Sequence, residues 1–311
     1  MARTVTSWTR RWRSAFVGHI AVFALAAPAC RAPTGPAVVV ATTTPVADLV
    51  QRVAGPDAIV TKLVLTGADP REAPANAESK LVGVRLAVRV GVGFDDWLDM
   101  LARRANPKVR SLALADRVPT RTSTLPARAA GSEDDGHEDP ARIDPYVWLD
   151  PQGMRLAAKA IGEELARADS AHAAAYRFRA GEVDEALRIL DEESEAKLVA
   201  CKAPPIVADR PVLGYFAERY RIPVVTVLRP FGTEATASWV ASVKATVTEL
   251  PAVAILATGK DIPQEMKTLG RSVTHVPVVD RPIDEAVRAL VDALCAAGKS
   301  AAVVPPAPAR P

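Results

Sequence analysis

The sequence has few of the residues that usually perform catalysis or bind metals. Its 311 residues include four histidines and three cysteines, and 5% of them are aromatic. It contains no phosphate-binding loop, no serine nucleophile elbow and no H-E-x-x-H zinc motif. The pair Gly91-x-Gly93 follows an apolar run, but Asp96 occupies the third glycine position of a dinucleotide fingerprint. We therefore expect a protein that is not an enzyme.

The chain also lacks a strong net charge. Its formal charge is +3, and four arginines lie among the first 30 residues with no acidic residue beside them. Subtracting these four leaves about −1 for the remainder. A nearly neutral protein has no electrostatic field that would hold a nucleic acid, so we expect no such partner.

The apolar run from Ala15 to Ala29 is too short for a confident membrane span. It follows a basic start and ends in small residues before Cys30, which predicts an export leader over residues 1–30. Cys30 is either the lipidated first residue of a lipoprotein or an incidental cysteine after an ordinary cleaved signal. Because Arg10 and Arg11 are adjacent, both the general secretory and the twin-arginine routes stay open. We expect a protein of the periplasm or outer cell surface, anchored to the membrane through Cys30.

Export would place the two remaining cysteines in an oxidising compartment. Cys201 follows a long predicted helix and Cys295 lies in the last one. They either form a disulfide or are two small buried apolar side chains.

The chain does contain a repeated unit of apolar strand, turn and amphipathic helix. Such alternation predicts an α/β fold with two lobes, each a four-stranded parallel sheet flanked by helices. The expected strands are Ala37–Thr44, Ile59–Leu65, Leu86–Gly93, Val109–Asp116, Ile206–Asp209, Pro223–Leu228, Val253–Gly259 and Val273–Asp280. The expected helices are Pro45–Ala54, Phe94–Ala105, Gln152–Ala168, Val212–Tyr220, Ala237–Glu249, Pro263–Leu269 and Ile283–Ala296.

A helix over residues 170–200, about 45 Å long, is expected to join the lobes. Gly181 inside this helix predicts a close crossing with another element. The predicted lobes cover residues 37–168, including an exposed loop at 117–142, and residues 203–298. A disordered tail would follow at 299–311.

Five segments resemble the substrate-binding lipoproteins of zinc and manganese ABC importers, the cluster A-I type of binding protein. The segments are TTTPVADLVQRVAG (42–55), TGADPREAP (66–74), VGVGFDDWLDML (90–101), IDPYVWLDP (143–151) and PVLGYFAERYRIPVV (211–225). The resemblance runs from about Val38 to Ala297. It implies an extracytoplasmic solute-binding component, a monomer that works with an ABC permease and carries zinc or manganese as its transported ligand.

The family is said to bind its metal with three histidines and one carboxylate between the lobes. Carried over by position, the histidines fall at Arg71, Tyr146 and Arg210, and the acidic ligand falls at Asp280, with Asp209 as a possible substitute. A guanidinium has only donors and stays protonated, so it cannot ligate a metal. The resemblance therefore implies a diverged ligand site.

Three interpretations of that site stay open. In the first, Arg71 or Arg210 pairs with Asp280 and ties the lobes together in place of the ion. In the second, the guanidiniums and the phenol of Tyr146 bind a small anion. In the third, the site is vestigial and the chain is an interaction protein that binds no metal. The segment EDDGHED (133–139) is either a metal-collecting loop of the zinc type or a solvated linker.

Overall fold

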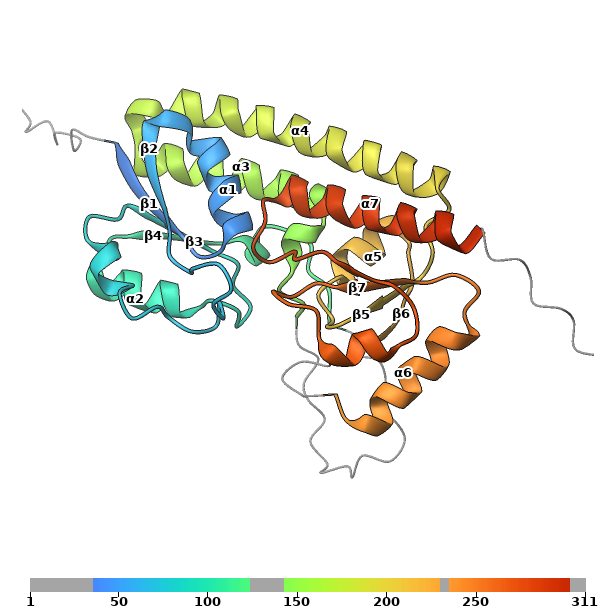
Figure 1. The fold of residues 1–311 in the computed structure, drawn as a ribbon. Helices are drawn as coiled ribbons and strands as arrows, with labels where there is room; N and C mark the ends of the chain where they lie inside the picture. Colours follow the sequence, from blue (N-terminus) through green and yellow to red (C-terminus); the bar gives the residue numbers. More distant parts are fainter. Residues whose placement is uncertain (1–35, 124–142, 230–234, 303–311) are drawn as a thin grey trace, which may run out of the picture. The chain divides into compact units, whose positions relative to one another are not determined.

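Eight parallel strands form two sheets in the computed structural model, which describes residues 36–123, 143–229 and 235–302 (Figure 1). The first sheet has the order β2-β1-β3-β4 and the second the order β6-β5-β7-β8. In each sheet, the strand that comes first in the chain is therefore internal. It has one strand on one side and two strands on the other. The strands are β1 (Ala37–Ala41), β2 (Ala58–Lys62), β3 (Leu86–Arg89), β4 (Arg110–Ala113), β5 (Ile206–Ala208), β6 (Val224–Val227), β7 (Ala254–Ala257) and β8 (Val273–His275).

Helices cover these sheets, and the predicted α/β class is confirmed. They are α1 (Thr44–Ala54), α2 (Trp97–Ala105), α3 (Pro151–Ala168), α4 (Ala173–Ala200), α5 (Gly214–Tyr220), α6 (Ala237–Glu249) and α7 (Ile283–Ala302). We call residues 36–123 the N-terminal lobe and residues 203–302 the C-terminal lobe. Among the described helices, none is long and apolar enough to cross a membrane.

Two elements of the C-terminal lobe differ from the predicted helices. The segment expected as the helix Pro263–Leu269 is a short 3₁₀ helix over Gln264–Thr268. Helix α7 runs to Ala302, so residues 299–302 are helical where a tail was predicted. Gly298 lies beyond the predicted end of this helix at Ala296, but in the structure it is inside the helix. A Cβ added to Gly298 would be 3.1 Å from the carbonyl oxygen of Cys201, which explains why a glycine is suitable there.

Helix α4 is the long element that contacts both lobes. Its 28 residues correspond to about 42 Å of helix. It packs along α3 and also contacts α1 and α7 (Figure 1). The predicted close crossing at Gly181 is wrong, because the space beside Gly181 is open. The close approach lies at Gly162 of α3, where an added Cβ would be 2.8 Å from the Cβ of Ala180.

The two lobes share one hydrophobic core. This core takes in Leu49 of α1, Leu187 of α4 and Leu290 of α7. It also includes Trp148 of residues 143–151, which we call the junction segment. Trp148 is 1% exposed, and its indole N–H donates to the carbonyl oxygen of Val278 at 3.2 Å. The junction segment is thereby fixed to the C-terminal lobe by both apolar packing and a hydrogen bond.

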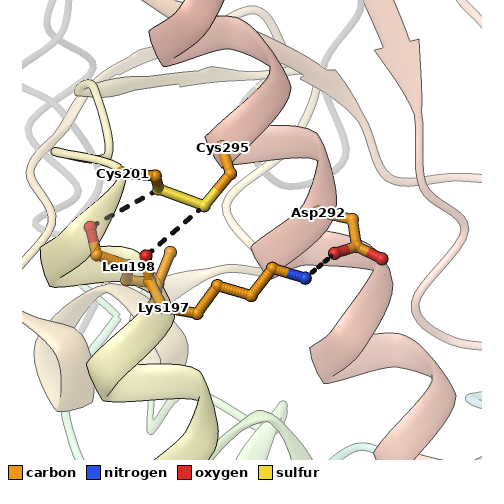
Figure 2. Close-up of a disulfide and its surroundings, with 5 residues drawn as sticks. All are labelled: Lys197, Leu198, Cys201, Asp292 and Cys295. Carbon is orange, nitrogen blue, oxygen red and sulfur yellow. Dashed lines mark hydrogen bonds and ion pairs between the residues drawn. A yellow bond between two sulfur atoms is a disulfide. The ribbon is translucent and has the colours of Figure 1, made fainter.

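A disulfide joins Cys201 at the end of α4 to Cys295 in α7, with 5.3 Å between their Cα atoms (Figure 2). Of the two sequence alternatives for these cysteines, the structure has the disulfide. Lys197 of α4 and Asp292 of α7 form an ion pair nearby. The predicted leader with Cys30 and the segment around His137 lie outside the described residues.

Candidate functional site

The junction segment is organised by Asp144, which is fully buried. Its carboxylate accepts hydrogen bonds from Arg121 Nη1 at 2.8 Å and from the backbone N–H of Tyr146 at 3.0 Å. Burial raises the pKa of Asp144, while these two hydrogen bonds act in the opposite direction. The buried carboxylate thereby holds the backbone of Tyr146 in place.

Tyr146 lies at the boundary between the lobes with 5% of its surface exposed. Its ring meets Phe94 and Trp148 edge-on, with centroid distances of 5.7 and 5.3 Å. Burial raises the pKa of the Tyr146 phenol, and the guanidiniums of Arg71 and Arg210 oppose that shift. The phenol therefore stays protonated at neutral pH, and in that form it is a poor metal ligand.

Arg71 belongs to the loop after β2. Its backbone N–H donates to Asp69 Oδ1 at 2.9 Å, and its Nη1 lies 3.6 Å from the same oxygen. The guanidinium carbon lies 5.3 Å from the centroid of the Phe94 ring, and Arg71 contributes a hydrogen bond to the phenol of Tyr146. The Trp97 indole N–H, which donates to the carbonyl of Pro70 at 2.9 Å, anchors this loop.

Asp209 and Arg210 follow β5. Asp209 is fully buried, and its oxygens accept from the Thr258 backbone N–H (2.8 Å), the Thr258 hydroxyl (2.5 Å) and the Gly259 N–H (3.3 Å). Arg210 Nε donates at 3.3 Å to Asp209 Oδ2, the oxygen that also accepts from the Gly259 N–H. Asp209, the predicted substitute ligand, is therefore occupied in joining β5 to the turn after β7.

The N-terminal lobe has a matching buried carboxylate that sequence reasoning missed. Asp95 accepts from the Thr42 hydroxyl at 2.6 Å and from the backbone N–H groups of Val90 and Gly91, both at 2.8 Å. Burial raises the pKa of Asp95, and these hydrogen bonds oppose the shift. The sequence signal for this contact is a threonine just after one central strand and an acid shortly after the next. These residues are Thr42 after β1 and Asp95 after β3.

Asp280 makes a direct contact between the lobes. Its Oδ2 accepts a hydrogen bond from the backbone N–H of Gly67 at 3.1 Å. Gly67 has a positive φ of 80°, and a Cβ added there would lie 3.1 Å from Cδ of Lys260. The loop that carries Arg71 therefore rests on Lys260 and Asp280 of the C-terminal lobe. Sequence reasoning had not singled out Lys260.

These residues do not form a ligand set suited to zinc or manganese. The site has two guanidiniums, a protonated phenol and one carboxylate that accepts from Gly67. No group of three or more His, Cys, Asp or Glu side chains capable of holding a metal occurs among residues 36–123, 143–229 and 235–302. His172 Nδ1 lies 2.7 Å from Asp169, and His275 Nε2 lies 2.8 Å from the Gly259 carbonyl. Zinc sites instead use neutral imidazoles, thiolates and carboxylates that converge on one point.

Comparisons with known proteins agree with the fold. The chain is 25% identical to the manganese-binding lipoprotein MntA of Bacillus subtilis over 186 residues, 58% of this chain and 57% of that one. It is 24% identical to a metal ABC transporter substrate-binding lipoprotein of Lactococcus lactis, over 60% of this chain and 59% of the relative. The chain thus spans less than two thirds of the length of these relatives.

Solved structures extend the similarity over more of the chain. The periplasmic zinc-binding protein TroA of Treponema pallidum superposes with a TM-score of 0.70 at 20% identity, covering 85% of this chain and 99% of TroA. A crystal structure of ZnuA gives a TM-score of 0.73 at 17% identity, with coverages of 85% and 99%. The family model described as zinc-uptake complex component A, periplasmic, matches residues 39–290. Since that match covers most of the sequence, the chain belongs to this family of zinc-uptake components.

Proposed function

We propose that the chain is the extracytoplasmic substrate-binding component of an ABC importer of the zinc and manganese class, with a diverged ligand site. It would be exported, anchored through a lipid on Cys30, and would deliver its ligand to a membrane permease without catalysing a reaction. Family membership and the names of the two lipoprotein relatives support this proposal. The fold supports it as well, since two α/β lobes share a core and contact one long helix.

The chemistry around Tyr146 determines what this component carries. Arg71 of one lobe and Arg210 of the other lie near enough to the phenol to act on it electrostatically, and each brings a guanidinium charge. Their charges repel a cation, and neither has a lone pair to offer it. The transported ligand is therefore not a bare zinc or manganese ion held at this point.

Calorimetry on protein freed of metal tests this proposal. We expect no submicromolar binding of zinc or manganese to the wild-type chain. The triple variant Arg71→His, Tyr146→His and Arg210→His restores the residue types of the family pattern and is expected to gain affinity for zinc. Tight zinc binding to the wild-type chain that is abolished by Asp280→Ala would contradict the diverged site. Co-purification with a permease encoded beside the gene tests the importer role separately.

One observation favours a second candidate, a binding protein for another macromolecule. The lobes contact each other directly through the Gly67 N–H and the Asp280 carboxylate. One similar structure, a mutant of the laminin-binding adhesin Lmb of Streptococcus agalactiae, has a TM-score of 0.70 at 17% identity. Transport assays with a reconstituted permease separate the candidates, because an adhesin would not stimulate the ATPase.

A further inference from the structure

The carboxyl end of β1 is the point where the order of strands in the N-terminal sheet reverses. The order β2-β1-β3-β4 means that the second strand of the chain is added on one side of β1 and the third on the other. Ligands of open parallel α/β sheets bind outside the carboxyl ends of the strands at such a switch point. Helix α1 begins directly after β1, so its N-terminal end lies at this position.

The N-terminal end of α1 has N–H groups that lack an acceptor. The N–H groups of Thr44 and Val46 donate to no other group in the described part of the chain. Thr43 precedes the helix with an extended backbone, and its side chain makes no capping hydrogen bond. The helix dipole adds a partial positive charge to these donors. A helix end of this kind is suited to bind an anion.

The hydroxyl of Thr43 is buried without a partner. Thr43 is 3% exposed, and its Oγ1 makes no hydrogen bond among the described residues. Burying an unpaired hydroxyl costs free energy, and a valine of the same shape would avoid that cost. At the position before a helix, a threonine hydroxyl lies next to the N–H groups of the first turn. A ligand at the helix end therefore explains a hydroxyl for which the protein itself supplies no partner.

Lys62 brings a full positive charge to the same place. It is the last residue of β2, and its Nζ donates to the Thr44 hydroxyl at 2.9 Å and to the Thr66 hydroxyl at 3.3 Å. Because both hydroxyl oxygens accept from the ammonium group, each hydroxyl proton stays available to donate to an anion. Lys62 is partly exposed and forms no ion pair with a described carboxylate.

Two carboxylates on neighbouring parts of the chain have partners of their own. Asp48 lies one turn further along α1, where its Oδ2 is 3.9 Å from Arg52 Nη1. Asp280 accepts from the N–H of Gly67. Since neither carboxylate forms an ion pair with Lys62 within the described ranges, direct contact with an acid does not neutralise the ammonium group.

From this set of donors, we infer that the N-terminal end of α1 binds a tetrahedral oxyanion, a phosphate or sulfate group. Lys62 supplies the charge, and the threonine hydroxyls together with the first N–H groups of α1 supply the hydrogen bonds. Lysine and helix N-termini are both common phosphate binders in proteins. The inference does not depend on the importer function, since all of these groups belong to the N-terminal lobe.

Titration calorimetry on the full chain with phosphate, sulfate and methyl phosphate tests the inference. We expect phosphate and sulfate to bind with a Kd of about 1 mM or tighter, and the affinity to fall as sodium chloride is added. Methyl phosphate identifies the source of the group. Binding as tight as that of phosphate assigns the site to a phosphate monoester, and much weaker binding assigns it to the free ion.

Variants assign the site. Lys62→Gln should weaken phosphate binding about 10- to 100-fold, because a hydrogen bond from a charged donor is lost. Thr43→Val should weaken it about 2- to 10-fold, while the melting temperature of the ligand-free protein stays equal or rises because an unpaired buried hydroxyl is removed. A hydroxyl with a purely structural role would give the opposite result, a lower melting temperature and an unchanged affinity.

Lys80→Gln is the matched control. Lys80 lies in the 3₁₀ helix Glu78–Leu81, which packs against α2, and this variant should bind phosphate as wild type does. The inference would be overturned if the wild-type chain bound neither phosphate nor sulfate at about 10 mM. It would also be overturned if Lys62→Gln and Thr43→Val bound phosphate as tightly as wild type. Loss of permease co-purification would count against the importer function alone.

Discussion

Arg121 pairs with the buried carboxylate of Asp144 at 2.8 Å, and this pair lies directly against the backbone of Gly214. The contact joins the end of the N-terminal lobe, the junction segment and the first residue of α5. A second link runs through Tyr215, whose hydroxyl donates to the carbonyl of Asp144 at 3.0 Å and accepts from the backbone N–H of Arg121 at 3.2 Å. The segment that presents Tyr146 is thus fixed by residues of both lobes.

We expect Gly214→Ala to be strongly destabilising. A Cβ at this position would lie 1.7 Å from Arg121 Nη1 and 2.5 Å from Asp144 Oδ2, so the ion pair would have to separate. Disrupting a buried charge pair typically costs about 3 kcal/mol or more of unfolding free energy. Urea denaturation followed by circular dichroism measures the loss.

The control for that prediction is Gly181→Ala in α4, where an added Cβ meets nothing within 4 Å. Replacing a helical glycine with alanine should stabilise the protein by about 1 kcal/mol. Equal effects from the two substitutions would show that the Arg121–Asp144 pair does not depend on the glycine.

Asp209→Ala distinguishes a scaffold role from a ligand role. The substitution leaves the N–H groups of Thr258 and Gly259 without their buried acceptor, and we expect a loss of about 3 kcal/mol. The same change at Asp95 should have a similar effect in the N-terminal lobe. A stable Asp209→Ala protein that had lost its ligand would instead assign Asp209 to binding.

Reducing the disulfide should lower stability. Cys201 and Cys295 are separated by 94 residues, and removing a native bond of this kind typically costs about 2–5 kcal/mol. We expect dithiothreitol to lower the denaturation midpoint of the wild-type chain. It should have no effect on the double variant Cys201→Ser, Cys295→Ser, and an equal response of the two proteins would contradict the prediction.

An acid-sensitive contribution to stability comes from Asp184 of α4. Hydrogen bonds from Arg155, at 3.0 and 3.2 Å, are the main cause that lowers the pKa of Asp184, and Lys159 adds to it. A carboxyl whose pKa is lowered on folding stabilises the protein above its unfolded pKa, and that stabilisation is lost as the pH falls through the folded value. The relevant window therefore lies below about pH 4.

Asp184→Asn should consequently destabilise the protein at neutral pH by about 1 kcal/mol at most, because the pair is near the surface. The difference from wild type should shrink as the pH approaches about 2. Glu182→Gln, a change of an exposed carboxylate on the same helix, is the control. A wild-type to Asp184→Asn difference that is constant across pH would refute the assignment.

The sequence was sufficient to predict all eight strands. The central strands β1, β3, β5 and β7 gave the clearest signal, because they are short apolar runs that are almost entirely buried. The predicted strands were too long at their carboxyl ends. Val90 and Gly91, for example, were assigned to a strand, but their N–H groups donate to Asp95 instead of to a neighbouring strand. A side chain that competes for backbone donors cannot be recognised from apolar periodicity.

The candidate site was harder to predict. Matching motifs gave the positions of Arg71, Tyr146 and Arg210, but they did not reveal the neighbours of each residue. The sequence suggested Asp209 as a possible ligand. In the structure, its carboxylate oxygens instead accept hydrogen bonds from the N–H groups of Thr258 and Gly259, which lie 49 and 50 residues further along the chain. Arg121 was not predicted at all, because the residues it contacts, Asp144 and Glu218, are distant in sequence.

The bond between Cys201 and Cys295 closes a covalent ring that contains nearly the whole C-terminal lobe. A protease that cuts the backbone once anywhere between residues 202 and 294 would therefore leave a single covalently connected molecule. Such a nicked protein would migrate as two fragments on a gel only after reduction. The last helix would stay attached to the rest of the chain after such damage.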